Sequence, residues 1–75
     1  MTEIETLLAD ARRAGYSVSE GPAGHISVLR CHARTGRILR GVTIYPNGTA
    51  IRADVDLAAA VAIRGVANIR KALGV

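Results

Sequence analysis

A strand–turn–strand unit is encoded by residues 25–45, which read HISVLRCHARTGRILRGVTIY. Apolar and polar residues alternate through 25–32 and again through 38–45, the period-two pattern of a half-buried strand. The intervening residues 33–37 contain Thr35-Gly36, which is typical of a turn. The pattern predicts two antiparallel strands in which Ile26 and Val28 face a core. The other face would then carry His25, Ser27, Leu29 and Cys31.

One further strand is predicted on each side of this unit, at 16–20 and at 49–54. The sheet has four strands if 49–54 pairs in it and three if it does not. The Asn47-Gly48 pair between 38–45 and 49–54 fits a two-residue type I′ turn, because both of its central positions need positive φ. The expected cross-strand neighbours are Ile44 with Ile51 and Val42 with Ala53 on one face, with Thr43, Tyr45 and Arg52 together on the other, open face.

The residues before the sheet predict a helix over 3–14. Thr2 and Glu5 have the spacing of a capping box, and Gly15 follows where a left-handed residue ends a helix. The apolar residues of one helical face are Ile4, Leu7, Leu8 and Ala11.

A second helix is predicted after the sheet. Asp54 or Asp56 would be its N-cap, and Gly74 would end it. Gly65 would lie in its interior, at a cost of up to about 1 kcal/mol relative to alanine. Its apolar stripe would contain Ala59, Ala62, Ile63, Val66, Ile69 and Leu73.

Together these elements predict an α+β fold, in which two helices pack on one face of a small three- to four-stranded antiparallel sheet. At 75 residues we expect a single domain, 1–75, with a thin core, since thirteen of its hydrophobic residues are alanine.

Composition excludes several classes of protein. Aromatic residues are 3%, which argues against a sheet that stacks a row of bases. With one cysteine and two histidines there is no zinc quartet, so we expect neither metal nor cofactor. The chain contains no signal-peptide pattern and no apolar run of roughly 18 residues, so we expect a cytoplasmic protein that does not enter membranes.

Charge is distributed unevenly along the chain, whose formal net charge is +4. No acidic residue occurs between Gly21 and Ala53. Such a segment favours binding to the phosphate backbone of RNA or DNA, with Tyr45 available to stack on a base. An alternative is that the arginines only keep a sheet edge soluble. The candidate binding residues are Arg30, Arg34, Arg37, Arg40 and Arg52.

His25 is the candidate catalytic residue. On the open face its imidazole would lie beside Arg52. An imidazole with a guanidinium is the minimum for metal-free RNA cleavage, in which the base takes the 2′-OH proton and the cation stabilises the phosphorane. The alternative is a surface histidine at the start of a strand. We expect His32 only to add charge at low pH, and Cys31 to act as a small apolar group.

The order of elements resembles the HicA-type toxins, small dsRBD-like proteins of toxin–antitoxin systems. The similarity lies in Ala14-Gly15-Tyr16, in Gly24-His25 at the entry to a strand, and in the last helix ending at Leu73-Gly74. It implies ribosome-independent mRNA cleavage with His25 in the catalytic role, and inhibition by a HicB-type antitoxin. This chain has Ala23-Gly24-His25 where the family commonly has Gly-Ser-His. The chain also resembles small orphan proteins of actinobacterial phages.

A protein-interaction module that binds and inhibits a host protein is the alternative function. Leu29 and Cys31 on the open face and the free edges of a small sheet favour it. Either function is compatible with a homodimer, because alanine-rich helices approach closely and a thin core gains from burying more surface.

Overall fold

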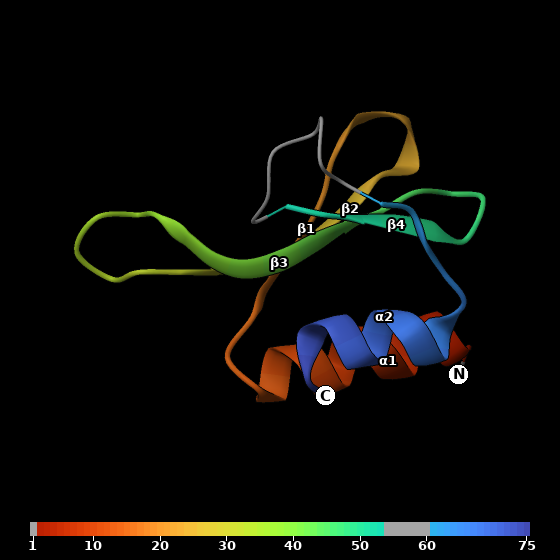
Figure 1. Ribbon diagram of the computed structural model, residues 1–75, viewed down its shortest axis with the longest axis horizontal. Coiled ribbons are helices and arrows are strands. Elements are labelled where there is room, and N and C mark those ends of the chain that lie inside the picture. Colours follow the sequence, from red (N-terminus) through yellow and green to blue (C-terminus); the bar gives the residue numbers. More distant parts are fainter. Residues whose placement is uncertain (1, 54–60) are drawn as a thin grey trace.

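The computed structural model describes residues 2–53 and 61–75, and these form two helices and five strands. The sheet is antiparallel throughout, in the order β1-β2-β3-β4-β5. Both helices lie beneath the same face of it (Figure 1), so the α+β prediction is confirmed. The elements are α1 (Glu3–Arg13), β1 (Ser17–Glu20), the 3₁₀ turn η1 (Pro22–Gly24), β2 (Ile26–Cys31), β3 (Ile38–Ile44), β4 (Thr49–Arg52), β5 (Ile63–Arg64) and α2 (Val66–Leu73).

The core lies between the helices and the sheet. Ile26 and Val28 face the helices as predicted, and Val28 is fully buried. The predicted stripe of α1 is also confirmed, with Leu7 and Ala11 fully buried and its other two members packed against them. The buried hydrophobic residues are Leu7, Ala11, Tyr16, Val28, Val42, Ile44, Ala50, Ile69 and Leu73.

Helix α1 begins and ends as its sequence predicts. The Thr2 hydroxyl accepts a hydrogen bond of 3.1 Å from the Glu5 amide, and the Glu5 carboxylate accepts one of 3.2 Å from the Thr2 amide. Gly15 follows the helix with φ of 96°. These contacts lie within a few residues of one another, which is why the sequence alone reveals them.

The predicted C-terminal helix is wrong at its beginning. Ile63–Arg64 is a strand paired with β4, Ala62 is exposed, and α2 begins only at Val66. Gly65 has φ of 86° and ψ of 146°, a region that is essentially restricted to glycine, so the helix cannot pass through it. The helix ends at Gly74 as predicted. The expected caps Asp54 and Asp56, and Ala59, lie outside the described residues.

The register between β3 and β4 also differs from the prediction. The turn has three residues, Pro46-Asn47-Gly48, closed by a hydrogen bond of 2.8 Å from the Tyr45 amide to the Thr49 carbonyl. Proline suits the first corner of a type I turn, and Gly48 takes the following left-handed position with φ of 86°. The observed neighbours are Ile44 with Ala50, Thr43 with Ile51, and Val42 with Arg52.

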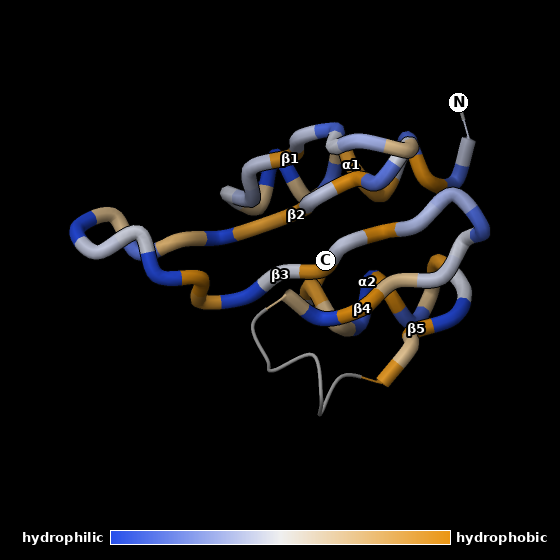
Figure 2. Tube along the Cα trace, turned by 90° about the horizontal axis from the view of Figure 1, so that it is seen from above, coloured by the Kyte–Doolittle hydropathy of each residue, from blue (hydrophilic) through white to orange (hydrophobic). Residues whose placement is uncertain are grey.

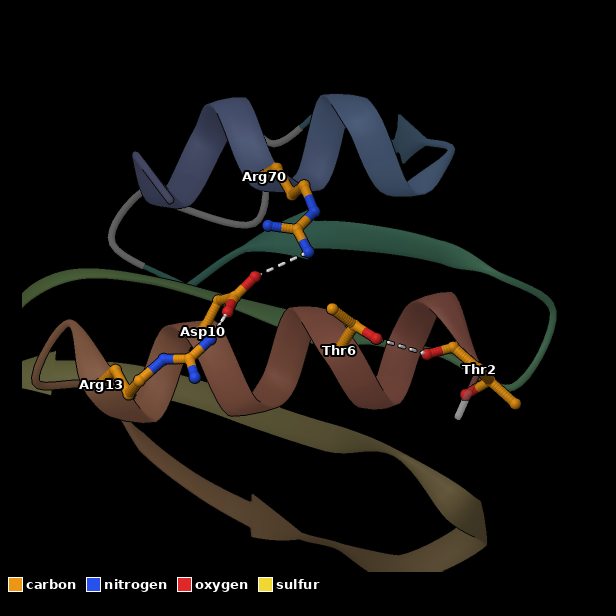
Figure 3. Close-up of polar contacts among 5 residues, drawn as sticks. All are labelled: Thr2, Thr6, Asp10, Arg13 and Arg70. Atoms are coloured by element: carbon orange, nitrogen blue, oxygen red, sulfur yellow. Dashed lines mark hydrogen bonds and ion pairs between the residues drawn. The ribbon is translucent and has the colours of Figure 1, made fainter.

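An ion pair ties the two helices together. The Asp10 carboxylate on α1 lies 2.8 Å from the Arg70 guanidinium on α2 and also contacts Arg13 one turn further along α1 (Figure 3). A hydrogen bond from Arg70, and a weaker effect of one from Arg13, lower the pKa of Asp10.

In residues 2–53 and 61–75 neither helix has the length and the apolar character that a membrane span requires.

Candidate nucleic-acid interface

The outer end of the β2–β3 hairpin, residues 31–40, is the most exposed part of the described chain, and we call it the distal ribbon. All ten of its residues are exposed. The register of β1 on β2 reaches only Leu29, and that of β4 on β3 reaches only Val42. The distal ribbon therefore extends past the neighbouring strands and beyond the ends of both helices (Figure 1).

The turn of the distal ribbon is held by its own side chains. His32 Nδ1 accepts hydrogen bonds of 3.1 Å from the Arg34 amide and 3.4 Å from the Thr35 amide. The Thr35 hydroxyl accepts one of 3.2 Å from the Arg37 amide, and Gly36 turns the chain with φ of 70°. His32 is thus an acceptor that orders the turn, a role that the sequence analysis missed because no residue type nearby signals it.

Arg34 and Arg37 flank this turn. Both side chains are exposed, and in the described part of the chain neither forms an ion pair. The nearest residues in sequence carry no carboxylate, since the acid-free segment includes the whole distal ribbon. These two guanidiniums are consequently available to an anionic partner.

Arg30 and Arg40, at the base of the distal ribbon, instead face the helices. They lie opposite each other in the β2–β3 register. The Arg30 guanidinium lies 4.4 Å from the centre of the Tyr16 ring and donates a hydrogen bond to the Ala14 carbonyl at the end of α1. Arg40 Nη1 lies 3.1 Å from the position that a Cβ on Gly74 would take. The C-terminal ends of helices carry partial negative charge, so both arginines contribute to packing the helices on the sheet.

His25 and Tyr45 form a contact at the opposite end of the sheet. Their ring centres are 4.6 Å apart and their planes make an angle of 81°. The two residues extend the Ile26–Ile44 pairing by one position, which places them on the face away from the helices. A Cβ on Gly24 would lie 3.3 Å from the Pro46 side chain, so the β1–β2 and β3–β4 turns also meet here. The prediction that His25 and Tyr45 share the open face is confirmed.

Arg52 does not join this pair. Its register partner is Val42, which is buried against the helices, so Arg52 belongs to the helix side of the sheet and the prediction that it shares the open face is wrong. The distal ribbon is also distant from His25, since the 6 residues of β2 at about 3.4 Å each separate them by about 20 Å. The candidate residues therefore form two separate surfaces.

Within residues 2–53 and 61–75 no group of three or more histidine, cysteine or acidic side chains could hold a metal ion. Cys31 is exposed.

No protein-family model matches the sequence, and neither a curated protein nor a solved structure matches it significantly.

Proposed function

We propose that this protein binds nucleic acid through its distal ribbon, with Arg34 and Arg37 contacting phosphates. The observation that carries the proposal is a projecting hairpin of ten exposed residues with three arginines and no carboxylate. Guanidinium groups match phosphate oxygens bidentately, and an ordered turn loses little entropy when it binds. Such a protein would act in the cytoplasm of a bacterial cell.

Fluorescence anisotropy with labelled RNA and DNA tests this proposal. Affinity should fall steeply with salt, and the paired substitutions Arg34→Ala and Arg37→Ala should reduce the slope of log K against log salt by about 2. The control removes the same charge from the exposed surface of the helices, by Arg12→Ala and Lys71→Ala. Equal losses in the two double variants, or binding that ignores salt, would contradict the proposal.

RNA cleavage by His25 is a second candidate, favoured by the contact between its imidazole and the Tyr45 ring on the face away from the helices. Arg52 lies on the helix side of the sheet, so this candidate needs a different cation to stabilise the phosphorane. In the HicA-like reaction the imidazole would take the proton of a 2′-OH, whose oxygen attacks the adjacent phosphorus. The 5′-oxygen of the next nucleotide leaves and takes up a proton from water, and the imidazolium returns its proton to the solvent. The products are a 2′,3′-cyclic phosphate and a free 5′-OH.

Incubation of the pure protein with labelled RNA in EDTA tests the second candidate. We expect the wild type to produce cyclic phosphate ends and His25→Ala to produce none, with circular dichroism unchanged. Tyr45→Phe keeps the ring contact with His25 and removes only the hydroxyl group. It therefore tests whether Tyr45 acts by positioning the imidazole through its ring or by transferring a proton through its hydroxyl. Cleavage that survives His25→Ala would exclude this histidine as the base.

A pull-down from nuclease-treated bacterial lysate distinguishes both candidates from a protein-interaction module. Recovery of a single protein, such as a HicB-like antitoxin or a host enzyme, together with no affinity for nucleic acid, would favour the interaction module. Sedimentation over a range of concentrations would detect the homodimer that the sequence allows.

A further inference from the structure

The distal ribbon has the dimensions of an element that enters a nucleic-acid groove. It is one hairpin with no other described strand beside it, and its two strands are about 4.8 Å apart. Strand pairing ends at Cys31 and Ile38, and residues 32–37 beyond that pair form a turn closed by a hydrogen bond of 2.8 Å from the His32 amide to the Arg37 carbonyl. The major groove of B-form DNA is about 12 Å wide and about 8.5 Å deep, and it admits a two-stranded ribbon.

We propose that the distal ribbon recognises double-stranded B-form DNA by entering its major groove. This inference rests on the proposed nucleic-acid binding and specifies its ligand. An A-form RNA duplex offers a deep and narrow major groove that side chains cannot read, so the same ribbon fits it poorly.

Single strands are also disfavoured as the ligand. Binding of single-stranded nucleic acid depends on aromatic rings on which successive bases stack. The only ring within the distal ribbon is the imidazole of His32, whose Nδ1 already accepts two amides of the turn. Tyr45 contacts His25 at the opposite end of β2 from the distal ribbon, so its ring is too far away to stack on a base held there.

Apolar side chains on the distal ribbon favour DNA over RNA. Ile38 and Leu39 are 36% and 51% exposed and directly follow Arg37. Figure 2 shows hydrophobic and hydrophilic segments following each other along this hairpin. In the major groove an arginine can bind guanine O6 and N7, and an apolar side chain can contact the 5-methyl group of thymine, which uracil lacks. Ile38 and Leu39 can therefore contact thymine methyl groups, which DNA contains and RNA does not.

The base of the distal ribbon determines its direction. Arg30 and Arg40 are held against the C-terminal ends of α1 and α2, on the helix side of the sheet. The guanidiniums that remain for the ligand are those at the tip, Arg34 and Arg37. The geometry therefore predicts insertion tip first, with residues 32–39 in the groove and the rest of the sheet and the helices outside it.

Anisotropy with matched duplexes tests the inference. The DNA and RNA duplexes have the same sequence and about 20 base pairs, which is about two helical turns, and both single strands are included. We expect the DNA duplex to bind roughly tenfold more tightly than the other three at equal salt. Methyl green, a major-groove ligand, should compete, and netropsin, a minor-groove ligand, should not. Equal or tighter binding of RNA, or competition by netropsin alone, would overturn the inference.

Removal of the thymine methyl group provides a second test. Replacing thymidine by deoxyuridine in the duplex should weaken binding of the wild type by about fivefold, and Leu39→Ser should bind the two duplexes equally. Leu39 is exposed, so the variant retains the core and should fold. Equal binding of both duplexes by the wild type would contradict the apolar contact. Binding of RNA alone would refute only this inference, whereas no binding to any of the four probes would refute the proposed function too.

Discussion

The Tyr16 hydroxyl donates a hydrogen bond of 2.7 Å to the carbonyl oxygen of Leu73, joining the start of the sheet to the last turn of α2. The same ring, 4% exposed, lies beneath the guanidinium of Arg30, which in turn binds the Ala14 carbonyl after α1. One aromatic side chain therefore connects β2 to the C-terminal ends of both helices.

We expect Tyr16→Phe to lower the free energy of unfolding by about 1–2 kcal/mol, because the Leu73 carbonyl loses its buried donor while the ring remains. Urea denaturation followed by circular dichroism measures the change. Tyr45→Phe is the matched control, since no hydrogen bond of the Tyr45 hydroxyl occurs within the described residues. An equal loss in both variants would show that the bond to Leu73 contributes nothing specific.

Arg30→Lys should keep the positive charge of the protein and still destabilise it, by about 0.5–1.5 kcal/mol, because an ammonium cannot both stack on Tyr16 and donate to Ala14 in the planar geometry of a guanidinium. Its affinity for nucleic acid should be unchanged. Arg34→Lys is the control at the tip of the distal ribbon, where we expect stability to stay constant. A loss of affinity in Arg30→Lys without loss of stability would assign Arg30 to the interface.

Acid unfolding should depend on Asp10. Its pKa in the folded state is lowered by Arg70 and Arg13. The carboxylate therefore contributes its stability above the unfolded value of about 3.9, and that contribution is lost as the pH falls through the lower, folded value. We expect Asp10→Asn to be less stable than the wild type at neutral pH, with the difference shrinking below pH of about 4. A difference that stays constant down to the acid transition would contradict the assignment.

Gly65→Ala distinguishes the observed helix start from the predicted one. In the interior of a helix the change would stabilise the protein by up to about 1 kcal/mol. At φ of 86° and ψ of 146° we expect it to destabilise by about 1–3 kcal/mol instead. The matched control is Gly36→Ala, also at positive φ with no atom near its missing Cβ, which should cost about 1 kcal/mol.

Elements whose determinants are local in sequence could be predicted. The capping box of Thr2 and Glu5 defines α1, and alternation defines β2 and β3. Strand β5 could not be predicted, because the helical period of its residues continues into α2 and only pairing with Thr49 and Ala50 overrides it. The turn after Tyr45 was misassigned because Asn47-Gly48 fits two turn lengths, and Pro46 selects the longer one.

In the candidate site too, features set by local sequence could be predicted and features set by strand register could not. That His25 and Tyr45 share one face follows from alternation along two adjacent strands, so the sequence predicts it, whereas their ring contact depends on the β2–β3 register. The position of Arg52 depended on the register of β4 and was therefore predicted wrongly. Arg30 donates to the Ala14 carbonyl and Arg40 lies beside Gly74, and no pattern of residue types reveals either contact.

The separation of the distal ribbon from the core has an evolutionary consequence. Its ten residues are exposed, and none of them belongs to the buried core. Substitutions at the tip can therefore accumulate with little effect on folding, provided that Gly36 and the acceptor at His32 persist. Selection can therefore change the sequence of this hairpin, and with it the ligand if the proposed binding holds, while the helices and the rest of the sheet stay the same.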